Sequence, residues 1–288
     1  MTIAKEKIYT RLLSETAGVS PRLFQELLLS FGQPSEIFDV TLPELSGHPR
    51  VGAKLAKAIS RAKESYPQME SEIHDFAVKK IYTVSFLEEN YPSLLRALGD
   101  PPPLLFYRGT FLFPNEKTVA VIGPNSPSPD AVAQAVRLGR GLAQSGVSVI
   151  TGPGKGVEAS AQVGAVVAEK PTRLVLSCGH EADLTDEEIT LGVQVEKKGV
   201  LLSEYSPPVK KSPEREAASR RLIVALSQAV LVIASSGADE HTEATFERAI
   251  QQGKPIFVFN PGKDADFPAE AVPLAREEEI ELLVCSLV

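Results

Sequence analysis

The chain has 288 residues, of which 43% are hydrophobic and 23% charged, and this length suggests one large domain and a smaller one. This composition excludes a disordered or fibrous protein. No segment reaches the roughly 18 apolar residues that a membrane span needs, so we expect a cytoplasmic protein without a membrane partner. The net charge of −7 excludes indiscriminate binding of nucleic acid over the whole surface, so any polyanion site must be local.

The two cysteines, Cys178 and Cys285, have no Cys or His nearby at the spacing of a metal site. Two thiols do not make a disulfide framework, so both are expected to be reduced, buried and inert. No cluster of Cys, His or carboxylates has recognisable ligand spacing, and we expect neither a metal nor a cofactor.

Residues 1–72 are predicted to form a small helical module, because their apolar residues recur at helical spacing. Gly18 and Gly32 are the expected helix stops, and Ser20-Pro21 is an expected start. Two turn-to-helix segments resemble helix-hairpin-helix and sterile-alpha-motif-like modules, and a docking or packing role without DNA contact is the alternative.

Residues 73–112 are predicted to connect this module to a larger domain. From Ile81 onward the pattern changes to short apolar runs bounded by turn residues. The prolines from Pro101 to Pro103 cannot continue a helix, and residues 104–107 are a predicted strand.

Residues 113–288 predict a Rossmann-like α/β domain. Helical stretches, among them residues 214–228 and 243–253, alternate with the strand candidates TVAVIG, VSVITG, TRLVLSCG, GVLLSEY, AVLVIAS and PIFVFNPG. Apolar strands that alternate with helices are typical of a parallel sheet with helices on both faces. Because such sheets bind ligands beyond the carboxyl ends of their strands, functional residues should follow the strands directly.

Two strand-to-helix turns are candidates for ligand binding, Gly123-Pro124-Asn125-Ser126 and Gly152-Pro153-Gly154-Lys155-Gly156. In the second turn, glycines let the backbone approach a ligand, the following helix offers unpaired N–H groups, and Lys155 adds a positive charge. The turn has neither the Walker A spacing nor the GxGxxG spacing of dinucleotide-binding proteins. It therefore predicts either a phosphate site or a merely tight turn.

Basic residues gather between positions 210 and 221, where five positive charges and two carboxylates give a local charge of +3. Such a run is often only a solvated face, but here it is expected on the same sheet rim as Lys155. We predict that Lys155, Arg220 and Arg221 form the core of a phosphate site. The full predicted set is Gly123, Asn125, Ser126, Gly152, Gly154, Lys155, Gly156, Lys210, Lys211, Arg220, Arg221 and Thr245.

No catalytic set is predicted. The histidines His48, His74, His180 and His241 lie in unrelated contexts, and none belongs to a nucleophile elbow or a Ser/His/Asp signature. We expect surface or packing histidines, although His180 follows a strand and could face the site.

Six segments keep the order found in one known family: YPSLLRALGDPPPLLFYRG, VAVIG with Ser126 and Ser128, TGPGKGVEASAQVGA, GVLLSEYSP, SRRLIVALSQAVLVI and GKPIFVFNPG. From about Leu12 to Gly262 the chain thus resembles the DNA-processing protein A family (DprA, also called Smf). The resemblance implies a Rossmann-like domain that binds single-stranded DNA and forms a homodimer. It further implies loading of a RecA-type recombinase during DNA uptake, natural transformation (competence) or recombination.

The chain departs from the family at several turns. The family's Gly-Ser-Arg reads Gly123-Pro124-Asn125 here and lacks the arginine, and its Ala-His reads Ala161-Gln162. The family's Gly-x-Ala-Arg-Gly-Ile-Asp reads GPGKGVE and keeps a basic residue and a carboxylate. Its Arg-Asn-Arg reads Ser-Arg-Arg at residues 219–221. We therefore expect a divergent member with weaker DNA binding, and no C-terminal winged-helix module after Gly262.

A second resemblance leaves other functions open. The Ser-Gly-x-x-x-Thr stretch of the DprA family reads EHTEAT at residues 240–245 here. TGPGKGVEASAQVGA followed by SSGADEHTEATFERAIQQGKPIFVF also resembles the lysine-decarboxylase-like (LOG-type) nucleotide-binding proteins. Their Pro-Gly-Gly-x-Gly-Thr-x-x-Glu motif would place His241 on its last glycine and Thr245 on its glutamate. A nucleoside monophosphate phosphoribohydrolase would then need Glu243 or Glu247 as its carboxylate. A non-catalytic nucleotide sensor and a degenerate interaction scaffold are the remaining alternatives.

Overall fold

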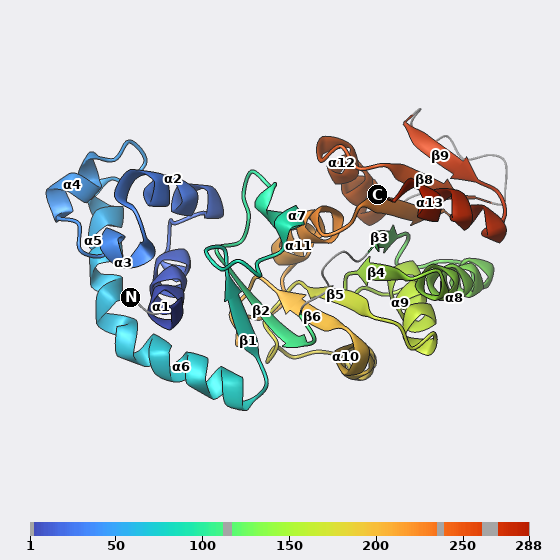
Figure 1. The fold of residues 1–288 in the computed structure, drawn as a ribbon, viewed down its shortest axis with the longest axis horizontal. Helices are drawn as coiled ribbons and strands as arrows, with labels where there is room; N and C mark the ends of the chain where they lie inside the picture. Colours follow the sequence, from blue (N-terminus) through green and yellow to red (C-terminus); the bar gives the residue numbers. More distant parts are fainter. Residues whose placement is uncertain (1–2, 112–116, 235–238, 261–269, 288) are drawn as a thin grey trace. The chain divides into compact units, whose positions relative to one another are not determined.

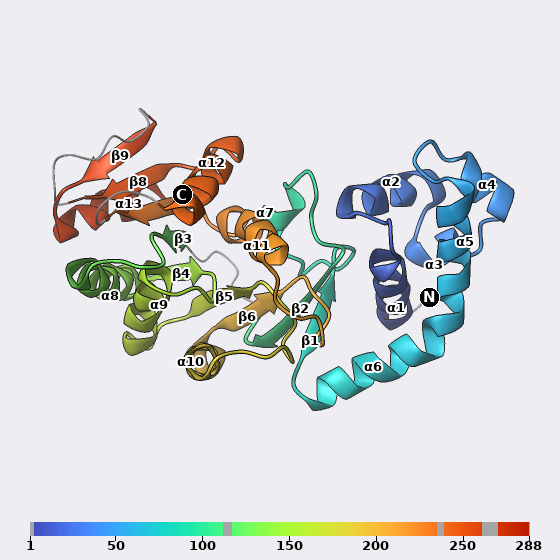
Figure 2. The same ribbon diagram turned by 180° about the vertical axis from the view of Figure 1, so that it is seen from behind.

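The computed structural model describes residues 3–111, 117–234, 239–260 and 270–287 (Figure 1; the reverse view is Figure 2). The chain divides into two compact units, Met1–Phe106 and Tyr107–Val288. Within the described ranges, no helix is long and apolar enough to cross a membrane.

The smaller unit is mainly helical, as predicted for its first part. Its elements are α1 (Ile3–Glu15), α2 (Pro21–Phe31), α3 (Pro34–Ile37), α4 (Leu42–Gly47), α5 (Ala53–Ala62), η1 (Lys63–Ser65), α6 (Tyr66–Val78), β1 (Tyr82–Ser85), α7 (Ser93–Arg96) and the start of β2 (Leu104–Gly109). The hydroxyl of Ser20 accepts a hydrogen bond from the Leu23 N–H at 3.2 Å and caps α2. Gly32, with a φ of 89°, ends that helix.

Apolar faces of α1, α2, α3 and α5 bury a core of their own. Leu13, Leu27, Ile37 and Ile59 are completely buried there. Helix α6 continues past residue 72, where the sequence pattern placed the end of the module, and reaches Val78. The change from helix to strand therefore falls close to Ile81, where the apolar pattern changes.

The larger unit alternates strands and helices. Its elements are β3 (Lys117–Ile122), α8 (Pro129–Gln144), β4 (Val147–Thr151), α9 (Val157–Val167), β5 (Thr172–Leu176), α10 (Asp186–Lys198), β6 (Val200–Ser203), α11 (Pro213–Ala225), β7 (Ala229–Ile233), α12 (Glu240–Gln251), β8 (Ile256–Phe259), β9 (Ala271–Leu274), η2 (Glu277–Glu279) and α13 (Ile280–Ser286).

Strands β3 to β9 form a parallel sheet in the order β6-β5-β4-β3-β7-β8-β9. The chain steps outward from β3 in one direction through β4, β5 and β6. It then returns to the other side of β3 and steps outward through β7, β8 and β9. The turns after β3, β4 and β7 therefore meet at the point where the strand order reverses, which is where open α/β sheets bind ligands.

Helices cover both faces of this sheet, as predicted, because right-handed crossovers in opposite directions place helices on opposite faces. One face packs its buried valines against α8, α9 and α13. Helices α11 and α12 pack against each other and contact β5 and β7. The Rossmann-like fold expected from the sequence is confirmed.

Helices α8 and α9 lie side by side in both views (Figures 1 and 2), and glycines permit their close approach. A Cβ added at Gly164 would lie 2.1 Å from the Val136 carbonyl oxygen, and one added at Gly139 would lie 2.1 Å from the Ala161 carbonyl oxygen. The two backbones are thus packed directly on each other, which fixes the start of α9 at the sheet rim.

Three features differ from the sequence-based expectations. Helix α10 lacks a distinct apolar period, and β9 contains Pro273 and exposes two of its four residues, so neither was predicted. Cys178 is buried as expected, but Cys285 is exposed, so the prediction that both thiols are buried is wrong for Cys285. The end of the predicted PIFVFNPG segment, Pro261 and Gly262, lies outside the described residues.

Replacing Gly164 by Ala should lower the free energy of unfolding by about 1–3 kcal/mol, because the new methyl group meets backbone atoms that cannot yield. Gly192→Ala in α10 is the matched control, since its Cβ would meet only a Leu201 methyl group at 3.2 Å. Alanine's better helix propensity should make that variant neutral or more stable. Urea denaturation measures both, and equal effects would contradict the close packing of α8 on α9.

Candidate functional site

A pocket of about 320 Å³ opens at the carboxyl ends of β3 and β4 and between the starts of α9 and α12. The residues that line it come from the two predicted turns, from α11, and from elements the sequence analysis did not single out. They are Asn125, Gly152, Pro153, Gly154, Lys155, Glu158, Ser177, Glu188, Lys211, Glu216, Ser219, Arg220, Ile223 and His241. The two glycine-containing turns and part of the basic segment therefore do meet at one site.

The turn between β4 and α9 requires glycine at Gly156. Its φ is 67°, and an added Cβ would lie 2.4 Å from the Pro124 carbonyl oxygen. The Val157 N–H donates to that same carbonyl at 3.2 Å, which ties the turn after β4 to the turn after β3. Lys155 is exposed at the tip of the turn.

Two backbone N–H groups at the sheet rim, of which Gly152 was predicted to receive a phosphate, already bind carboxylates of the protein. Gly152 N–H donates to Glu158 Oε2 at 3.0 Å, and Asn125 N–H donates to Asp239 Oδ2 at 3.0 Å. Asp239 also caps α12, where it accepts from the Thr242 N–H at 2.9 Å and the Thr242 hydroxyl at 2.6 Å. The protein's own acidic side chains thus hold anion positions at this rim.

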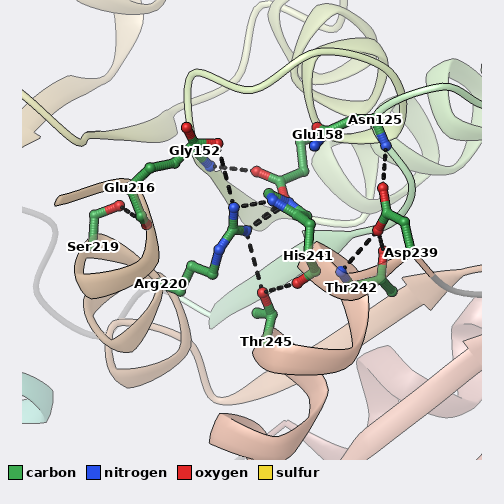
Figure 3. A network of polar contacts seen from close by, with 10 residues as sticks. All are labelled: Asn125, Gly152, Glu158, Glu216, Ser219, Arg220, Asp239, His241, Thr242 and Thr245. Atoms are coloured by element: carbon green, nitrogen blue, oxygen red, sulfur yellow. Dashed lines mark hydrogen bonds and ion pairs between the residues drawn. The ribbon is translucent and has the colours of Figure 1, made fainter. Parts of the chain in front are cut away.

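Arg220 lies at the centre of the polar network in Figure 3. Its guanidinium contacts both ring nitrogens of His241, donates to the Thr245 hydroxyl at 3.3 Å, and lies 3.7 Å from Glu158 Oε1. Glu216 accepts from it at 3.4 Å. A buried arginine needs such partners, because an unpaired charge inside a protein is costly.

Glu158 completes the network from the other side. One carboxylate oxygen lies 2.6 Å from His241 Nε2, while the other accepts from the Gly152 N–H. Its side chain is only 1% exposed, and this burial raises the pKa of the carboxyl to about 7, against the opposing effects of Arg220 and the Gly152 N–H. Burial also lowers the pKa of Arg220, and the nearby Glu158 carboxylate offsets part of this decrease.

The charged residues that line the pocket balance one another. The cations are Lys155, Lys211 and Arg220, and the carboxylates are Glu158, Glu188 and Glu216. Lys211 is ion-paired with Glu188. With His241 neutral, the formal charge of the described lining is therefore zero, and the excess of +3 counted in residues 210–221 is not carried into the pocket.

The other predicted residues lie around the pocket rather than in its lining. Gly123 is a packing glycine, because an added Cβ would lie 2.7 Å from the Ile233 carbonyl oxygen. Ser126 is exposed, and the buried Thr245 hydroxyl donates to the His241 carbonyl at 2.9 Å. Lys210 is exposed and lies 3.6 Å from Asp183.

Arg221 is held outside the pocket. Its guanidinium donates to both oxygens of Glu204, at 2.7 and 2.6 Å, and each side chain is 10% exposed. A bidentate pair of this kind uses the face of arginine that would otherwise bind phosphate. Successive residues of a helix point about 100° apart, which lets Arg220 on α11 line the pocket while Arg221 pairs with Glu204 outside it.

Sequence patterns did not indicate the roles of His241, Glu158 and Asp239. His241 and Asp239 come from the first turn of α12, which is far from Glu158 in sequence, and the reversal of strand order brings them together. By contrast, His180 is a packing histidine as expected: it is buried, its pKa falls to about 4 because of this burial, and it does not line the pocket. Gln162 is a core residue, and its amide bridges Thr151 and the Arg173 carbonyl, each at 3.3 Å.

No group of three or more His, Cys, Asp or Glu residues in the described part of the chain could hold a metal ion.

Comparison with known proteins identifies similar sequences and folds. The family model for DNA recombination-mediator protein A matches residues 82–271. The chain is 22% identical over 240 residues to DNA processing protein DprA of Bacillus subtilis, covering 83% of this chain and 80% of that protein. It is 27% identical over 238 residues to protein Smf of Synechocystis, covering 79% of this chain and 58% of that protein.

Two solved structures share the fold. The X-ray structure of DprA from Streptococcus pneumoniae matches with a TM-score of 0.77 at 19% identity, over 100% of this chain and 99% of that one. A structure of DNA processing protein A from Helicobacter pylori, described as showing its single-stranded DNA binding mode, matches with a TM-score of 0.63 at 24% identity, over 73% of this chain and 98% of that one.

Replacing Glu204 by Gln should lower the free energy of unfolding by about 3–5 kcal/mol, because it removes the carboxylate charge from a buried bidentate pair with Arg221. The double variant Glu204→Leu/Arg221→Met removes both charges and should lose less. Urea denaturation measures the three proteins. An unfolding midpoint for Glu204→Gln equal to that of the parent would show that Arg221 does not depend on this pair.

Proposed function

The chain belongs to the DNA recombination-mediator protein A family, and from this premise we propose that it binds single-stranded DNA through the pocket at the reversal of strand order. The observation that carries the proposal is that the family match, residues 82–271, encloses every residue that lines this pocket. The Helicobacter pylori protein, whose structure is described in terms of its single-stranded DNA binding mode, supports the choice of ligand.

In this proposal, backbone phosphates contact Lys155 at the rim and Arg220 in the interior, with Lys211 beside them. Lysine supplies a point charge, whereas arginine can grip two phosphate oxygens. The start of α9 adds its positive end to the same site. Arg221, which the sequence pattern placed in this core, would reach a phosphate only after leaving Glu204.

We further propose that the protein acts in the cytoplasm, forms a homodimer and helps load a RecA-type recombinase on single-stranded DNA. The support for these partners is the family membership alone. The apolar residues of β7 and β8 are buried within the sheet and so supply no dimer surface. The recombinase role predicts faster filament formation on single-stranded DNA when the protein is present.

A binding protein fits the pocket better than an enzyme. The hydrolase alternative needs a carboxylate from Glu243 or Glu247, but both side chains are exposed and neither is among the described residues that line the pocket. A non-catalytic nucleotide sensor would bind mononucleotides but no oligonucleotides. Competition by mononucleotides in a DNA-binding assay separates this alternative from the proposed one.

Lys155→Ala should weaken the binding of a fluorescently labelled oligothymidylate and lower the salt slope of the affinity by about 0.7, the value for one phosphate contact on a single strand. The loss should not depend on base sequence, because phosphate contacts carry no base information. Fluorescence anisotropy across a salt series, with single-stranded and double-stranded oligonucleotides, measures both quantities.

Lys170→Ala is the matched control, because it removes the same charge from an exposed residue beyond the other end of α9. An equal loss in both variants would show that the pocket is not the site. A parent protein that binds mononucleotides but no oligonucleotide would replace the proposed function by the nucleotide sensor.

A further inference from the structure

Two carboxylates of the protein occupy the positions that an anion would take in the pocket. Glu158 bridges the Gly152 N–H and His241, and Asp239 holds the Asn125 N–H (Figure 3). The Glu158 carboxylate also lies 3.7 Å from the Arg220 guanidinium, which is the one cation buried in the lining described here. An incoming phosphate must therefore compete with an internal anion for the same donors.

The two carboxylates differ in how readily they take up a proton and give up their hydrogen-bond donors. Asp239 is at the start of α12, where the hydrogen bonds from Thr242 and Asn125 outweigh its partial burial and hold the pKa of its carboxyl below the usual value. It therefore stays charged. Glu158 is fully enclosed, and the pKa of its carboxyl rises to about 7, within the range of ordinary solution conditions.

Charged groups from several elements surround Glu158. Arg220 and Glu216 come from α11, and His241 and Asp239 from the start of α12. Lys155 in the turn that leads into α9, Glu188 on α10 and Lys211 line the same pocket. A bound anion would add a negative charge to this enclosed cluster. Since like charges disfavour ionisation of a carboxyl group, the anion would raise the pKa of Glu158 further.

We propose, resting on the proposed function of the pocket, that Glu158 takes up a proton from solvent when the pocket binds a phosphodiester of single-stranded DNA. The protonated carboxyl releases Arg220 to the phosphate, and the charge of the cluster stays the same. The pocket is then a proton-linked anion site, whose affinity rises as the pH falls.

Uptake of one proton for each bound anion predicts an affinity that weakens by about tenfold for each pH unit above 7 and levels off below it. Anisotropy with an oligothymidylate that lacks terminal phosphates, from pH 5.5 to 8.5, measures this slope without a titrating ligand. Glu158→Gln keeps the shape of the side chain without its charge, and it should bind more tightly than the parent at pH 8.5 with little dependence on pH.

Glu216→Gln is the matched control. It removes one negative charge from an exposed side chain that contacts the same arginine, so it should change the affinity and keep the pH slope. A parent protein with the same affinity at pH 5.5 and 8.5 would overturn the inference and leave DNA binding intact. A slope that persists in Glu158→Gln would also overturn it.

A sulfate titration separates this inference from the proposed function, because sulfate does not titrate in this pH range. Sulfate should raise the unfolding temperature of the parent below pH 7 and that of Glu158→Gln at all pH values. If this holds while no variant binds oligonucleotides, the proton-linked site stands and DNA binding fails. If sulfate stabilises the parent equally at pH 5.5 and 8.5, or stabilises neither protein, the inference fails.

Discussion

The contact of Glu158 with Arg220 is the interaction on which the site depends. Arg220 can be buried at the sheet rim because Glu158, His241 and Glu216 surround its guanidinium. Glu158 in turn can be buried because it meets that arginine and the Gly152 N–H. Each charge offsets part of the cost of burying the other.

The backbone explains why these residues meet. The strand order reverses beside β3, so that the turns after β3 and β4 and the start of α12 lie at one edge of the sheet. Glycine at positions 139 and 164 lets α8 and α9 pack backbone to backbone, and Gly156 lets the two turns touch. In the described part of the chain, tight backbone packing therefore places the residues of the candidate site.

Sequence patterns predicted the fold well and the site in part. Apolar strands and glycine turns depend on local residues, which is why the parallel sheet, the Ser20 cap and the turn around Lys155 could be found. Ion pairs depend on which side chains the fold brings together, and a count of charges in residues 210–221 does not contain that information. Arg221 consequently looked like a ligand of phosphate, although Glu204 binds it, and His241 was not recognised as a partner of Arg220.

The lining of the pocket has no excess of positive charge, although the basic sequence segment suggested one, because carboxylates match its cations. The proposed entry of single-stranded DNA into this pocket can be followed by the backbone amide NMR signals of the protein when an unlabelled oligothymidylate is added at pH 6. We expect the largest changes at Gly152, Gly154 and Asn125 and in the first turn of α12. Changes confined to the helices of residues 3–78 would contradict this proposal.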